Sequence, residues 1–438
     1  MDAKTIVANE MVNRGMRHMG KTSTSMSTGL MSKWGFAKRE PLPPERRLSK
    51  DAVTALIIHS CFQFGASMSG LFLNLYLWRL TQDLTVNGIY NIVVFLLTPP
   101  TFALGGWLAK RRDRMVTYRL GIVLIALFYL MVVIAQEQVA QFYIAFAIFN
   151  GIAAGLYWTG YLVIQYDVST DANRIRFLAI NMVVFNSAGL AGPALAGFII
   201  QRSEGLQGYI VIFMLAFIMF VIAAIVSFRI PMVRSHHKAY YLKFMGLVMS
   251  KNRRWLKALY SFFVLGLFQG IMLFLPNIML FQTVGREDWV GYLGVFFSSL
   301  TVATGYVISR LAQKEHVRKY VMLSTTGVVI GSALLLIRME FWSVAAFMIL
   351  FSICNPLAIN TLTSYYYRLI GTLPLKGQLR VESVVMRELF LNIGRVVSIT
   401  LLIWLAADLE SVWMPIVLFA MATLQYALVL LIREKQEA

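Results

Sequence analysis

The sequence predicts an all-α integral membrane protein whose 12 transmembrane helices form two pseudo-symmetric six-helix bundles. Of its 438 residues, 58% are hydrophobic and the mean hydropathy is +0.67, far above the range of soluble proteins. A helix needs roughly 20 apolar residues to cross a bilayer. The apolar runs are continuous and do not alternate with polar residues, which excludes an outer-membrane β-barrel. The predicted spans cover residues 53–80, 86–109, 116–135, 141–165, 177–200, 208–230, 255–282, 289–312, 319–337, 341–368, 383–407 and 412–432.

The basic residues predict a multi-pass protein of the cell (plasma) membrane with both termini in the cytoplasm. All but six of the 40 Lys and Arg residues then lie on the cytoplasmic side, as the positive-inside rule requires. The net charge of +19 is spread over separate segments between spans, so we expect no nucleic-acid partner. The six exceptions are Arg79, Arg202, Arg286 and Arg338 on the other side and Arg119 and Arg395 within spans.

Residues 1–51 form a basic segment that lacks the apolar mass of a folded domain, which predicts a cytoplasmic tail. The tail would lie on anionic lipid headgroups or remain a solvated arm that fixes the topology. The first six-helix bundle follows at 52–230, the cytoplasmic central loop at 231–254, the second bundle at 255–432 and the cytoplasmic C-terminus at 433–438.

Three polar positions recur at one offset of 206 residues, which indicates a duplication of six helices. Two parallel repeats of this kind enclose a substrate site near the middle of the membrane. The repeated pairs are Gln63 and Gln269, Tyr161 and Tyr367, and Asn186 and Asn392.

The segment "GGWLAKRRDRMV" at 105–116 follows the second predicted span. It resembles the loop between the second and third helices of the major facilitator superfamily, G-x-L-a-D-r-x-G-r, and the resemblance extends over residues 52–432. The segments "NLYLWRL", "NRIRF" and "RVESVVMRELFLNIGR" resemble sequences of a poorly characterised branch found in Gram-positive bacteria. The matching residues are Gly106, Leu108, Ala109, Arg111 and Arg114, whereas Lys110 replaces an Asp and Asp113 replaces a Gly.

In that family the Asp faces the start of the eleventh helix and helps to hold the outward-open state, so Lys110 leaves this particular contact open. The resemblance implies a cytoplasmic gate around the loop. The residues that we assign to it are Gly106, Lys110, Arg111, Asp113, Arg114, Asp167 and Arg387.

The fifth predicted span carries small residues at the spacing of the superfamily's antiporter signature. Three of the usual glycines are alanines, so the segment favours export or simply allows close helix packing. These residues are Ala179, Ala188, Gly192, Pro193, Ala196 and Gly197.

Charges inside the spans are rare, and most of them gather on one helix. Glu388, Asn392 and Arg395 follow at i, i+4 and i+7 and therefore share one helix face. Charged groups are costly in lipid and usually functional. Arg395 would bind an anionic group of the cargo, or Arg387, Glu388 and Asp167 would form a structural latch with the 110–114 turn.

Uncharged polar side chains complete the candidates for substrate binding or coupling. Each alone also fits a hydrogen bond between helices. They are Gln63, Asn74, Asn150, Tyr157, Tyr161, Asn186, Gln269, Asn277 and Asn360, beside Glu388, Asn392 and Arg395.

These residues predict a secondary active transporter of the major facilitator type that works by alternating access and exports a small amphipathic compound, with proton coupling left open. The alternative is a flippase for a lipid or lipid-linked sugar. No Ser/His/Asp or metal-ligand constellation is visible, so we expect no enzyme, no cofactor and no metal site. We expect a small-molecule or lipid substrate, contact with membrane lipids and a monomeric chain.

Overall fold

The computed structural model describes residues 47–169, 173–232, 239–311, 316–374, 379–406 and 411–432. The chain divides into residues 1–48, of which only Arg47 and Leu48 are described, and a compact unit of residues 49–438. Almost all of the predicted tail, and the predicted C-terminus at 433–438, therefore lie outside the described residues.

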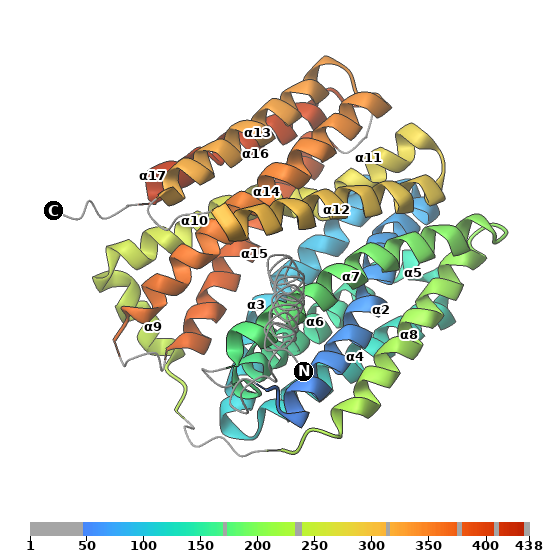
Figure 1. Ribbon diagram of the computed structural model, residues 1–438. Coiled ribbons are helices and arrows are strands. Elements are labelled where there is room, and N and C mark those ends of the chain that lie inside the picture. Colours follow the sequence, from blue (N-terminus) through green and yellow to red (C-terminus); the bar gives the residue numbers. More distant parts are fainter. Residues whose placement is uncertain are drawn as a thin grey trace, which may run out of the picture. The chain divides into compact units, whose positions relative to one another are not determined.

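All regular structure in the described part of the chain is helical, and 12 helical segments are long and apolar enough to span a membrane (Figure 1). The prediction of 12 membrane-spanning helices is confirmed. The first six are α2 (Lys50–Thr81), α3 (Leu84–Arg111), α4 (Arg114–Ala135), α6 (Tyr143–Asp167), α7 (Arg174–Gln201) and α8 (Gln207–Ser227).

The second six spans follow a short connecting helix, α9 (Leu242–Lys251). The seventh span is interrupted at residues 273–274, shortly before Pro276, since proline cannot continue the hydrogen-bond ladder of a preceding helix. These spans are α10 (Arg253–Met272) with α11 (Leu275–Val284), α12 (Glu287–Leu311), α13 (Val317–Ile337), α14 (Phe341–Gly371), α15 (Arg380–Leu405), and α16 (Trp413–Leu424) with α17 (Ala427–Leu431). A further short helix, α5 (Gln138–Gln141), precedes α6.

Polar side chains fix where several helices begin. Ser49, Asp83, Asp113 and Asn252 each accept a hydrogen bond from a backbone N–H in the first turn of α2, α3, α4 and α10. Such caps satisfy N–H groups that have no partner within the helix. Asp113, which stands where the resembled loop motif has a Gly, caps α4 in this structure.

Close helix packing within each half depends on glycines. A Cβ added at Gly192 of α7 would lie 2.3 Å from Ser67 Oγ of α2, and one at Gly394 of α15 would lie 2.2 Å from the backbone oxygen of Phe263 in α10. Only the missing side chain lets these backbones approach. Across the two halves, α3 packs on α15 and α7 packs on α12.

We name the two ends of the bundle by their residues. The basic end holds the start of α2, the turn between Arg111 and Arg114, and the start of α15; the opposite end holds the turns after Thr81 and Val284. The connecting helix α9 belongs to the basic end, where its Met245 and Val248 pack into an apolar cluster around Trp255.

Candidate functional site

Arg395 of α15 is held by two amide groups and one aromatic ring. Its Nη1 donates to Asn392 Oδ1 over 3.2 Å, and its Nη2 donates to Gln269 Oε1 of α10 over 3.1 Å. The guanidinium carbon lies 5.1 Å from the centre of the Phe95 ring, which comes from α3 in the other half. Three predicted site residues, Gln269, Asn392 and Arg395, are therefore brought together, and Phe95 joins them.

No carboxylate of the described chain forms an ion pair with Arg395. Glu388, which shares its helix face, is paired instead with the adjacent Arg387, with 2.6 Å between Arg387 Nη2 and Glu388 Oε1. The Nε of Arg395 is buried and has no hydrogen-bond partner among the described residues. The guanidinium is thus in direct contact only with neutral amide oxygens and a ring face, and no described carboxylate lies close enough to form an ion pair with it.

The first half repeats the two amides of this site but not its cation. Gln63 of α2 corresponds to Gln269, and Asn186 of α7 corresponds to Asn392. At the position that corresponds to Arg395, the first half has Gly189, where an added Cβ would meet no atom of the described chain within 4 Å. The two halves therefore differ by one large charged side chain at equivalent places.

A second pair of equivalent contacts supports the duplication. Asn181 Nδ2 donates to the Tyr161 hydroxyl over 2.8 Å, and Arg387 Nη1 donates to the Tyr367 hydroxyl over 3.4 Å. Both donors and both acceptors are related by the same offset of 206 residues. The offset thus matches tertiary contacts as well as residue types.

Tyr157 and Tyr161 of α6 surround a buried histidine of α2. His59 Nδ1 lies 3.0 Å from the Tyr157 hydroxyl, and its ring stacks on Tyr161 with 4.2 Å between ring centres. Tyr157 is fully buried and also stacks on Phe62. Sequence reasoning missed the pairing of His59 with Tyr157, for which a lone polar residue in an apolar span was the only signal.

Two further candidates join helices within the first half. Asn74 Oδ1 of α2 accepts a hydrogen bond from Asn91 Nδ2 of α3 over 2.8 Å, and Asn150 Nδ2 of α6 donates to the Tyr90 hydroxyl over 2.8 Å. Both side chains serve helix packing in this conformation. The remaining candidates differ in burial: Gln63 is buried, Asn186 and Asn277 are half-buried, and Asn360 is exposed.

The basic end holds an ion pair between the halves. Lys110 Nζ of α3 lies 2.5 Å from Glu382 Oε1 of α15, and Glu382 is fully buried. Both groups also bind the connecting segment, since Lys110 donates to the Ala239 backbone oxygen over 3.1 Å and Glu382 accepts from the Tyr241 N–H over 3.0 Å. Burial, with Glu382 nearby, raises the pKa of Tyr240 well above its usual range, so this phenol stays neutral.

A contact with the start of α15, which the resemblance left open, is therefore present and is formed by Lys110 and the Glu382 carboxylate. Gly106 lies beside it: an added Cβ would be 3.1 Å from Val381 Cγ1 of α15. Arg111 covers the Trp107 ring at 4.9 Å. Arg114 lies in the first turn of α4, and the side chain of Asp167 lies outside the described residues.

The opposite end holds a second ion pair between the halves. Arg79 Nε of α2 lies 3.4 Å from Glu287 Oε1 of α12, and the Tyr209 hydroxyl of α8 donates to the same oxygen over 3.5 Å. Here α7 also meets α12 closely, with Gly197 and Gly291 in mutual contact. Two of the signature glycines thus serve packing, Gly192 against α2 and Gly197 against α12.

Within the described ranges, no group of three or more His, Cys, Asp or Glu side chains is arranged to hold a metal ion. The polar groups of the spans can bind ligands by hydrogen bonds and charge.

Sequence comparison gives the chain's relatives. The profile of the Major Facilitator Superfamily matches residues 55–373. The chain is 32% identical over 372 residues to the uncharacterized protein YqgE of Bacillus subtilis (strain 168), covering 84% of this chain and 86% of that protein. It is also 31% identical over 175 residues to an uncharacterized protein of Geobacillus stearothermophilus, covering 40% of this chain and 82% of the other.

Solved structures of transporters share the fold. A mutant of the nucleoside transporter NupG superposes with a TM-score of 0.69 at 13% identity, covering 87% of this chain and 98% of NupG. A D-xylose–proton symporter gives a TM-score of 0.67 at 15% identity with the same coverage. Such structures consist of two six-helix halves. With the matching profile and the related Bacillus chain, these comparisons show that the protein is a membrane transporter and belongs to the major facilitator superfamily.

Proposed function

We propose that this transporter exports a small amphipathic compound with an anionic group, by alternating access, and that Arg395 binds that group. The observation that carries the proposal is the guanidinium of Arg395, held in place by Gln269 and Asn392 without a counterion in the described chain. Both amide oxygens accept from the guanidinium and so fix its orientation.

An arginine inside a membrane span is costly unless its surroundings stabilise the charge. An unpaired Arg near the centre of a span costs about 2.5–3.5 kcal/mol on insertion scales. A structural arginine would offset this cost with a carboxylate, but Glu388 is occupied by Arg387. A substrate anion would supply the missing charge and form two parallel hydrogen bonds with the guanidinium.

The first half has a glycine at the position equivalent to Arg395, which would leave space for the rest of the substrate. Gly189 stands at the position equivalent to Arg395 and leaves space where an added Cβ would meet nothing within 4 Å in the described chain. A binding site with a cation on one half and open space on the other suits a compound that is charged at one end only.

Two ion pairs support alternating access. Lys110 and Glu382 join the halves at the basic end, and Arg79 and Glu287 join them at the opposite end. Rocking of one half against the other would open one end while the other stays closed. The positive-inside rule supports a cytoplasmic location of the basic end, and the antiporter-like spacing in α7 supports export.

A second candidate function is the flipping of a lipid or lipid-linked sugar. Its support is the same arginine, because a lipid phosphate would satisfy the guanidinium as well as a carboxylate does.

The test compares paired ligands on the purified full chain. Small aromatic carboxylates and the matching amides, such as benzoate and benzamide, would be screened by thermal unfolding in detergent. We expect carboxylates alone to raise the unfolding temperature of the wild type, and we expect Arg395→Gln to remove that shift. Arg202→Gln, which changes an arginine stacked on Phe198 at the opposite end, is the matched control.

Transport is then measured in proteoliposomes with the stabilising carboxylate, with and without a pH gradient. Gradient-driven movement that Arg395→Gln abolishes would support the exporter, and gradient-independent scrambling of a fluorescent phospholipid would support the flippase. Equal stabilisation by amides and carboxylates, or an unchanged shift in Arg395→Gln, would contradict the assignment of Arg395.

A further inference from the structure

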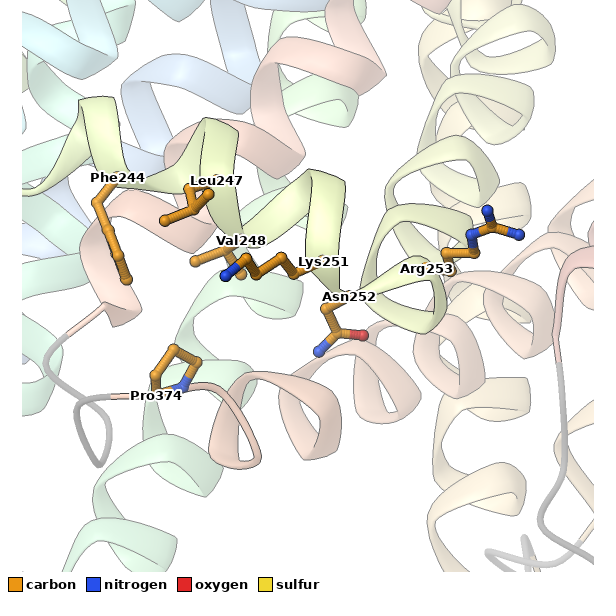
Figure 2. Close-up of a pocket in the computed structure, with 7 residues that line it drawn as sticks. All are labelled: Phe244, Leu247, Val248, Lys251, Asn252, Arg253 and Pro374. Atoms are coloured by element: carbon orange, nitrogen blue, oxygen red, sulfur yellow. The ribbon is translucent and has the colours of Figure 1, made fainter.

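A recess of about 510 Å³ lies at the basic end, beside the connecting helix α9 (Figure 2). One of its sides is apolar and the other is polar, and none of its lining residues is acidic. The lining comes from α9, from the start of α10 and from the segment after α14. Its residues are Phe244, Leu247, Val248, Lys251, Asn252, Arg253 and Pro374.

The apolar side of the recess remains uncovered in the described chain. One face of α9 is buried, because Met245 and Val248 pack against the cluster around Trp255. Leu247 belongs to another face and is 48% exposed, although it is a large apolar side chain. An apolar face beside lysines is typical of a helix that lies in the membrane interface.

The polar side presents nitrogen donors. Lys251 is exposed, and Figure 2 shows its side chain extending over the recess toward Val248 and Leu247. Asn252 caps α10 by accepting the Trp255 N–H at Oδ1 over 3.0 Å, which leaves its amide nitrogen to donate elsewhere. The guanidinium of Arg253 points away from the recess (Figure 2).

The position along the chain places this recess at the depth of lipid headgroups. Helix α10 begins a membrane span directly after Asn252. The start of a span lies where hydrocarbon gives way to headgroups, and the first N–H groups of a helix favour an anion there. A ligand at this point would have a phosphate at its polar end and hydrocarbon at the other.

We propose that the recess binds an anionic phospholipid, with the phosphate against Lys251 and Asn252 and an acyl chain along Leu247 and Phe244. Charge complementarity supports this ligand, since the lining has cationic and amide donors and no carboxylate. Because α9 packs on α10 and α15, the bound lipid would fix the connecting helix against the second half at the membrane surface.

The experiment uses the purified full chain and native mass spectrometry from mixed micelles. Phosphatidylglycerol and phosphatidylcholine would be offered at equal concentration. We expect preferential retention of phosphatidylglycerol, and a loss of about fivefold in its binding in Lys251→Gln, the size expected for one interfacial cation. Lys243→Gln, an exposed lysine of α9 that does not line the recess, should bind like the wild type.

Two further measurements test the acyl-chain contact and the need for a complete lipid. Leu247→Asn should weaken phosphatidylglycerol binding because it removes the acyl-chain contact, and inorganic phosphate alone should not compete at millimolar concentration. Equal binding of both lipids, full binding in Lys251→Gln, or competition by free phosphate would overturn the proposal. Unliganded unfolding temperatures of all variants would show that each one is folded.

Discussion

Lys110 Nζ lies 2.5 Å from Glu382 Oε1, so one ion pair joins α3 of the first half to the start of α15 in the second. The carboxylate is fully buried and its Oε2 has no partner in the described chain. A buried carboxylate that loses its cation is strongly destabilised. We therefore expect the loss of this pair to lower the stability of the fold more than the loss of any other contact described at the basic end.

The first prediction concerns variants in which the charges of Lys110 and Glu382 are exchanged. Lys110→Glu and Glu382→Lys should each destabilise the fold by about 3–5 kcal/mol, because each places two like charges together in a buried site. The double variant should recover most of that loss. Denaturant or thermal unfolding in detergent measures the cycle, and strictly additive losses in the double variant would contradict a direct pair.

The second prediction concerns the opposite end. Glu287→Gln should change stability by less than about 1 kcal/mol, because Arg79 is 36% exposed and the pair is looser at 3.4 Å. Glu382→Gln is the matched comparison, with an expected loss of about 3–5 kcal/mol. Similar losses in the two variants would show that burial does not set the strength of these pairs.

The third prediction compares two glycines. Gly394→Ala should lower stability by about 1–3 kcal/mol, because the new Cβ would lie 2.2 Å from the Phe263 backbone oxygen. Gly189→Ala should raise it by about 0.5–1 kcal/mol, because alanine favours a helix and the site is open. Unfolding temperatures of the two variants check the contrast, and a loss at Gly189 would show that the space there is occupied.

The fourth prediction tests the histidine of α2. Tyr157→Phe should cost about 1–3 kcal/mol, because it leaves buried His59 without the hydroxyl 3.0 Å from its Nδ1. The same change at Tyr292, which is 44% exposed, is the control and should have little effect. If Tyr157→Phe is as mild as the control, the hydrogen bond contributes nothing to stability.

The helices were predictable because the bilayer imposes a strong and simple pattern. A span must be about 20 apolar residues long and must satisfy its own backbone groups, so hydropathy alone finds it. The offset of 206 residues also carried real information, because it relates the Tyr161–Asn181 and Tyr367–Arg387 contacts. Sequence order shows such equivalence without any knowledge of the fold.

The partners of the polar side chains were not predictable in the same way. Glu382 is separated from Lys110 by 272 residues, and nothing local to either residue indicates their pairing. Glu388 shares a helix face with Arg395, yet its neighbour Arg387 takes the carboxylate. Asn74 and Asn150 have the residue type of a binding site, but only the packing of α2, α3 and α6 shows that they bind other helices.

The connecting segment also bonds to the ion pair at the basic end. Ala239 accepts from Lys110, and Tyr241 donates to Glu382, so the linker between the halves is bonded to both members of the ion pair. Pulling this linker away from the ion pair would therefore break one backbone hydrogen bond of Lys110 and one of Glu382. The contact between the two halves at the basic end would then be weaker. An antibody fragment that binds residues 239–241 is expected to change the transport rate without competing with the substrate.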